Sequence, residues 1–200
     1  MSYYLNEKPE GEVTLEVMDA SGDIIQSFSS DAGEGRPKIS TNAGMNRFIW
    51  NIRYPSAYTI GDGARGQSGP LAPPGSYQVR LGVDGNEQTE NFEVVKDPRV
   101  SATDDDFKAQ FDFLIKVRDR LSETNDSVSK IRMISNQVDE WVNRAKGHPE
   151  ADAVNNSADA LNKKLSALEG ELVQTVDKEA LDRFNPQFKL SNKLAELTRV

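Results

Sequence analysis

Hydrophobic and polar residues alternate through the first half of the chain, and this period of two predicts β-strands. The alternation covers 13–17, 24–28, 48–54, 77–83 and 92–94. The segment 48–54 carries the largest β-forming side chains on one face, so we expect Trp50 to anchor the core. Turn-forming residues separate the segments. Five or more short strands of this kind predict an antiparallel β-sandwich.

The second half changes to a helical pattern. Between Asp104 and Lys146 there is neither Gly nor Pro, and a heptad frame of apolar residues holds throughout. Its two core positions hold Phe107, Leu114, Leu121, Val128 and Val142, and Val117, Ile131 and Val138, with polar Thr124 and Ser135 in the same seam. Because the frame does not slip at the polar run 122–127, we predict one helix of about 40 residues, roughly 60 Å long.

The Asp97-Pro98 step marks the predicted domain boundary, because proline cannot donate a ladder hydrogen bond. The fold class is therefore α+β, with a β-sandwich at 1–98 and a three-helix bundle at 99–200. The helices are expected at about 103–146, 150–176 and 186–200, the second antiparallel to the first. The last one reaches Val200 without a capping residue, which predicts a domain cut from a longer polypeptide.

Composition excludes several classes of function. A net charge of -8 argues against a nucleic-acid partner, which requires a concentrated basic surface. No apolar run is long enough to span a bilayer, and the N-terminus lacks the basic-then-apolar layout of a signal peptide. Cysteine is absent, so the chain has no disulfide, thiolate metal site or cysteine nucleophile.

Several motifs resemble binding sites but lack the necessary context. The glycine loop 61–66 is followed by prolines rather than a phosphate-binding helix, and 19–23 lacks the Gly and Glu of a calcium loop. The single histidine, His148, lies between Gly and Pro and predicts an interhelix turn. The carboxylates of 104–106 fit a helix N-terminus, after an N-cap at Ser101 or Thr103. We therefore predict no catalytic residues, no metal site and no cofactor.

Three tyrosines near the long loop are the best candidates for contact with a ligand or partner. Tyr54, Tyr58 and Tyr77 could stack on sugars at the edge of the sandwich, although packing within the sheet is the preferred interpretation.

The segments 13–22, 44–54 and 72–81, with the Asp97-Pro98-Arg99 exit, resemble the C-terminal region of large bacterial BNR-repeat, sortilin-like propeller proteins. In that family the region has an immunoglobulin-like domain, similar to that of flagellar hook-capping proteins, and a helical tail. The resemblance implies a periplasmic or secreted parent protein with this region as an attached, non-catalytic domain. The propeller repeats with their Asp-box turns are absent from this chain, so hydrolase activity is not implied, and no binding residue of the family maps onto it.

The predicted function is a non-catalytic structural or protein-interaction module. Its partner would be a neighbouring propeller domain or another subunit, and the helix seam could support an oligomer. The alternative is a carbohydrate-binding accessory module of an extracellular glycoside hydrolase, based on the tyrosines and the sandwich class. A stand-alone enzyme has the least support, because no nucleophile, base and orienting group can be assembled.

Overall fold

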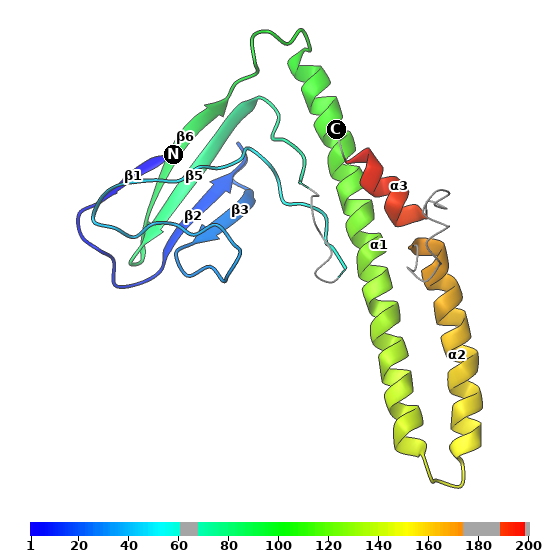
Figure 1. The fold of residues 1–200 in the computed structure, drawn as a ribbon. Coiled ribbons are helices and arrows are strands. Elements are labelled where there is room, and N and C mark those ends of the chain that lie inside the picture. The colour runs from blue at the N-terminus through cyan, green and yellow to red at the C-terminus, as the bar shows by residue number, and fades with distance from the viewer. Residues whose placement is uncertain (61–67, 174–188, 199–200) are drawn as a thin grey trace, which may run out of the picture. The chain divides into compact units, whose positions relative to one another are not determined.

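The computed structural model describes residues 1–60, 68–173 and 189–198, and within them the fold is mixed α+β (Figure 1). Two antiparallel sheets and three helices are present in these ranges. The strands are β1 (Ser2–Leu5), β2 (Val13–Met18), β3 (Ile24–Ser29), β4 (Gly44–Arg47), β5 (Gly75–Val83) and β6 (Asn86–Val94). The helices are α1 (Asp104–Ala145), α2 (Ala151–Leu172) and α3 (Leu190–Leu197).

The chain divides into two compact units. The first comprises 1–55 and 68–113, and the second comprises 56–67 and 114–200. The predicted boundary at residues 97–98 lies inside the first unit, between β6 and α1. The segment from residue 56, which the prediction assigned to the sandwich, belongs to the second unit because it is bonded to the middle of α1.

The larger sheet has the strand order β3-β2-β5-β6 and contains both predicted hairpins. In the β5–β6 hairpin, Asp84 and Gly85 both have positive φ, at 48° and 81°. Two such residues in succession form the mirror-image turn whose twist matches the flanking strands. The second sheet pairs β1 with β4, a pairing that the residue pattern did not predict.

The structure corrects the strand predicted at 48–54. Strand β4 ends at Arg47, and the segment 48–54 forms an isolated bridge between Arg53 and Leu71 rather than a strand. The Asn51 side chain accepts a hydrogen bond from the Arg53 amide at 3.2 Å, and Ile52 has a φ of 58°. A positive φ is incompatible with an extended strand and is rare for a β-branched residue. The turn at Asn51 therefore interrupts the extended backbone.

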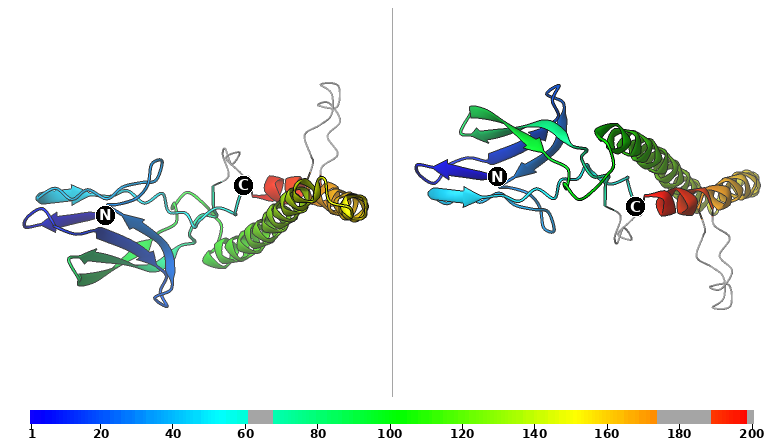
Figure 2. Two further views of the ribbon diagram at one scale, coloured as in Figure 1. Left: turned by 90° about the horizontal axis from the view of Figure 1, so that it is seen from below. Right: turned by 90° about the horizontal axis from the view of Figure 1, so that it is seen from above.

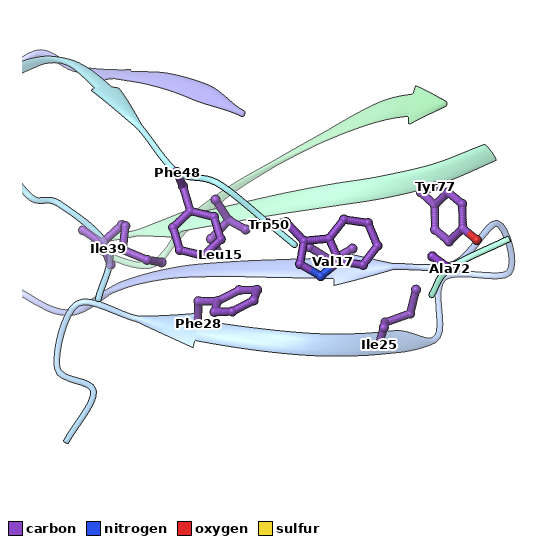
Figure 3. Packing of buried hydrophobic residues seen from close by; sticks show 10 residues of the cluster. Leu15, Val17, Ile25, Phe28, Ile39, Phe48, Trp50, Ala72 and Tyr77 are labelled. Atoms are coloured by element: carbon purple, nitrogen blue, oxygen red, sulfur yellow. The ribbon is translucent and has the colours of Figure 1, made fainter. Parts of the chain in front are cut away.

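Trp50 nevertheless anchors the core of the first unit, as predicted. Figure 3 shows Phe48 and Trp50, from the segment after β4, facing Leu15 and Val17 of β2 and Phe28 of β3. The Phe28 and Phe48 rings lie 4.5 Å apart. Both views of Figure 2 show the β1–β4 pair to one side of the larger sheet. The core therefore forms on one face of the four-stranded sheet.

The long first helix is confirmed, since α1 is a single helix of 42 residues. All the predicted heptad residues are buried or half-buried, and Val117, Leu121, Thr124 and Val128 are the most enclosed. This agreement follows from the physics of the seam, because each apolar side chain removed from water contributes roughly 1.5 to 3 kcal/mol.

Helix α2 returns antiparallel to α1, as predicted. Ser135 donates a hydrogen bond to Asn162 at 3.1 Å, and Arg132 donates to Glu169 at 2.7 Å, so contacts earlier in α1 meet residues later in α2. Helix α1 ends at Ala145, one residue before the predicted end at 146, and α2 begins at Ala151, one residue after the predicted start at 150. The predicted end of the second helix, the start of the third and its last two residues lie outside the described residues.

Candidate functional site

Tyr77, on β5, is part of the core rather than of an exposed ligand platform. Its side chain is only 4% exposed, and its ring stacks on Phe92 with the centroids 5.8 Å apart. The hydroxyl donates to the Pro73 carbonyl oxygen at 2.7 Å. Burial raises the pKa of Tyr77 to about 12, with smaller contributions from the neighbouring Tyr54 and Asp19. Packing within the sheet is therefore the correct interpretation of this residue.

The other two tyrosines have different surroundings. Tyr54, in the first unit, is half-buried, and its ring lies 4.6 Å from that of Phe111. Tyr58, in the second unit, is half exposed and is held through its backbone and hydroxyl by α1. Tyr54 and Tyr77 thus share the core region of the first unit, whereas Tyr58 belongs to the second unit and is the most exposed of the three.

A spectrophotometric titration of the tyrosines will test the burial of Tyr77. We expect one tyrosinate transition near pH 12, whereas an ordinary tyrosine titrates near 10. Because the unfolded chain releases this proton at the lower pH, the stability that Tyr77 contributes is complete below about pH 10 and is lost as pH rises towards about 12.

Tyr77→Phe should remove the transition near pH 12, while the pKa of Tyr3, which burial also raises, remains above its ordinary value. Tyr4→Phe is the matched control, because Tyr4 is a strand residue with an exposed ring. A wild-type titration without any transition well above pH 10 would contradict the buried environment.

The Asp19–Asp23 segment forms the turn of the β2–β3 hairpin. Asp19 Oδ1 accepts hydrogen bonds from the backbone amides of Ser21, at 2.8 Å, and Asp23, at 3.0 Å. Gly22 has a φ of 90°, which suits a glycine. The carboxylate is thus engaged by its own turn, and the hairpin interpretation is confirmed.

The acidic start of α1 is a helix cap. Asp106 Oδ2 accepts from the Thr103 amide at 2.8 Å, and the Asp106 amide donates to Thr103 Oγ1 at 3.2 Å. This reciprocal pair satisfies backbone donors at the helix N-terminus. The hydrogen bonds from Thr103 lower the pKa of Asp106. Of the two predicted caps, Thr103 is the one used.

Of the remaining motifs, only the one at His148 falls in the part of the chain that the structure describes. The glycine loop 61–66 lies outside the described residues. His148 lies between α1 and α2, where its Nδ1 accepts a hydrogen bond from the Glu150 amide at 3.3 Å. In the ranges that the structure describes, no three His, Cys, Asp or Glu side chains are grouped to hold a metal ion. None of the helices described here is both long and apolar enough to cross a membrane.

The best candidate for a contact site in the first unit is a mostly apolar groove, of about 340 Å³, beside the end of β6. We call it the β6-edge groove. Phe48, Ile49 and Ile52 line it from the segment after β4, and Val94 and Val95 line it from the end of β6. Ile49 is 74% exposed and Val95 is 78% exposed. Exposed apolar side chains gathered around a groove are typical of a protein-contact surface.

The position of β6 adds hydrogen-bonding capacity to this groove. In the described sheet β6 pairs only with β5, so its other edge presents unpaired backbone groups. A partner segment there could pair with the backbone and place apolar side chains in the groove. Strand β6 carries Glu87, Glu90 and Glu93, of which Glu87 is ion-paired with Arg80 of β5 at 3.5 Å, and charge on an edge strand limits indiscriminate pairing.

A second arrangement, in the second unit, was missed by the sequence reasoning. Asn125 is buried within α1, and its Nδ2 donates to the Tyr58 carbonyl oxygen at 2.6 Å. The Tyr58 amide donates to Ser122 Oγ at 3.0 Å, and Ser191 of α3 donates to Asn125 Oδ1 at 3.0 Å. The polar run 122–127 was the sequence feature that could have indicated this arrangement. Polar side chains beside a buried apolar seam normally have hydrogen-bond partners elsewhere in the chain.

These hydrogen bonds join three segments that are far apart in the sequence, so we interpret the Asn125 arrangement as structural. No side chain in it is placed as a nucleophile or a general base.

No family model matches the chain, and comparison with curated proteins and with solved structures found no similar protein for either unit.

Proposed function

We propose that this chain is a non-catalytic structural or protein-interaction module of a larger extracytoplasmic propeller protein. In this proposal an immunoglobulin-like β-sandwich docks on the neighbouring propeller domain, and a helical bundle extends the contact surface. The propeller partner and the periplasmic or secreted location come from the resemblance of 13–22, 44–54 and 72–81 to the C-terminal region of such proteins.

The β6-edge groove is the observation that carries the proposal. A neighbouring domain would cover Ile49 and Val95, whose apolar side chains are otherwise exposed to water. Each Å² of apolar surface that is buried contributes about 25 cal/mol to the free energy of association. The two sheets with a shared core in the first unit support the sandwich class. The buried seam of α1 supports the bundle.

The test is binding between this chain and the propeller domain encoded in the same reading frame, produced as separate proteins. Ile49→Asp or Val95→Asp should weaken binding at least about tenfold, or about 1.4 kcal/mol, because each places a charge in an apolar contact. The change in dissociation constant can be measured by isothermal titration calorimetry.

Met45→Asp is the matched control. Met45 is 73% exposed on β4 but does not line the groove, so its substitution should leave binding unchanged. A parent reading frame without a propeller, or equal affinity for all three variants and the wild type, would contradict the proposal.

A further inference from the structure

Large apolar side chains are exposed together on the α1–α2 hairpin of the second unit. They are Met133, Ile134 and Trp141 on α1 and Leu161 and Leu168 on α2. We call this set the hairpin face. Trp141 is 64% exposed, and the Arg144 guanidinium lies over its ring, 5.4 Å from the centroid. Single exposed apolar residues are ordinary, but Ile134 and Trp141 on α1 and Leu161 and Leu168 on α2 each recur after seven residues on two adjacent helices, and such a group is typical of a contact surface. Met133 borders this group, because it is turned by about 100° from Ile134.

The polar contacts between the helices locate this face. Arg132 bonds to Glu169, and Asn162 donates to Asp139 Oδ1 at 3.0 Å, which marks one flank of the interface. Each leucine of the hairpin face immediately precedes one of these α2 residues, and is turned from it by about 100°. Ile134 and Trp141 lie two positions beyond the α1 contact residues. Heptad geometry therefore places Ile134 and Trp141 of α1 on the same flank of the hairpin as the two leucines of α2. This flank is opposite to the one that carries the polar contacts.

The burial pattern of α2 agrees with this placement. Its least exposed residues include Ala158, Asn162, Leu165 and Glu169, which follow the flank with the polar contacts. Leu168 is 53% exposed although it occupies a heptad position that usually faces a partner helix. The flank of the hairpin that carries the exposed leucines is thus apolar, while the opposite flank carries the polar contacts between the helices.

Charges beside the hairpin face identify the occupant. Asp126, Lys130, Glu140 and Arg144 lie on the outward side of α1, and all are more than half exposed. Within α1 they form two ion pairs, Lys130 with Asp126 at 2.6 Å and Arg144 with Glu140 at 3.7 Å, and they read acid, base, acid, base along the helix. If a second α1 runs antiparallel, Asp126 faces Arg144 of the second copy and Lys130 faces Glu140 of the second copy. Both pairings are centred on the same position, residue 135.

The same alignment also fits the apolar residues. Residues 127, 134 and 141 are seven apart, so they share one face of α1. In the antiparallel arrangement Ile134 meets Ile134 of the second copy, and Trp141 lies against the small Ser127 of the second copy. The centre of these contacts is within one residue of the centre of the charge pairs. A parallel alignment would instead oppose like charges.

We propose that two copies of this chain associate through their hairpin faces, with the two α1 helices antiparallel, in an arrangement of four helices. Such contacts are isologous, as in most dimers with twofold symmetry. The inference goes beyond the proposed function and does not depend on it, because it uses no residue of the β6-edge groove. Failure of one test therefore leaves the other proposal standing.

The first test is the oligomeric state of the full chain, by size-exclusion chromatography with light scattering over a range of concentrations. We expect a dimer that Ile134→Asp weakens at least about tenfold. Asn136→Asp is the matched control and should leave the dimer unchanged, because Asn136 is exposed on the same helix but is turned by about 200° from Ile134. Circular dichroism will confirm that each variant keeps its helices. A wild-type protein that is monomeric at all concentrations, or a dimer unaffected by Ile134→Asp, overturns the proposal.

Charge exchange tests the antiparallel register. Lys130→Glu and Glu140→Lys should each weaken the dimer, because either one puts like charges opposite each other twice in a symmetric pair. The double variant restores opposite charges and should recover most of the affinity. Since the chain has no cysteine, Met133→Cys and Gln137→Cys proteins can also be mixed and oxidised. The mixture should cross-link better than either protein alone; failure of both the recovery and this preference overturns the register.

Discussion

Replacing Leu121 by aspartate is expected to abolish the cooperative folding of the second unit. Leu121 is 1% exposed and lies at the centre of the buried stretch of α1. The substitution removes a buried side chain and puts an unpaired carboxylate in its place, at a cost of at least about 3 to 5 kcal/mol. This is a large part of the 5 to 15 kcal/mol by which proteins are typically stable.

The measurement is the far-ultraviolet circular dichroism signal and its thermal midpoint. Asn136→Asp is the matched control, because Asn136 is exposed on the same helix and belongs to the second unit. That change should cost less than about 1 kcal/mol, through helix propensity alone. An unchanged helical signal and midpoint in Leu121→Asp would refute the buried seam.

Trp50→Ala should destabilise the first unit by about 3 to 5 kcal/mol, the usual cost of truncating a buried aromatic residue. The indole is 8% exposed, and its centroid lies 6.1 Å from the rings of both Tyr77 and Phe92. Its Nε1 donates to the Arg53 carbonyl oxygen at 3.2 Å. The loss therefore combines packing with a hydrogen bond that supports the turn after β4.

Urea unfolding followed by circular dichroism will measure this effect. Fluorescence would not serve, because the remaining tryptophan, Trp141, belongs to the second unit. Tyr4→Ala is the matched control, since this aromatic residue is 63% exposed, and its removal should change stability by less than about 0.5 kcal/mol. Equal effects of the two substitutions would mean that Trp50 is not the anchor of the core.

The elements predicted from the sequence were those in which local chemistry decides the structure. The two hairpins follow from alternation and from turn residues such as Gly22 and Gly85, which are adjacent in the chain to the strands that they join. The length of α1 follows from its unbroken heptad frame and its capping box at Thr103. Among the candidate site residues, Tyr77 was placed correctly by the expectation that it packs within the sheet.

The tertiary structure decided what depends on residues far apart in the chain. Alternation at 48–54 predicted a strand, but the Asn51 turn and the positive φ of Ile52 redirect the backbone. Asn125 is a polar helix residue by its local pattern, and only the bonds to Tyr58 and Ser191 explain its burial.

The sequence by itself determined the α+β class, the two local hairpins and the long helix, because periodicity, turns and caps act between near neighbours. The β1–β4 pairing, the β6-edge groove and the exposed hairpin face were decided by tertiary structure. An apolar residue such as Trp141 fits a buried or an exposed helix face equally well in its local pattern. Which apolar helix residues remain exposed to a partner depends on which of them are buried by the rest of the folded chain.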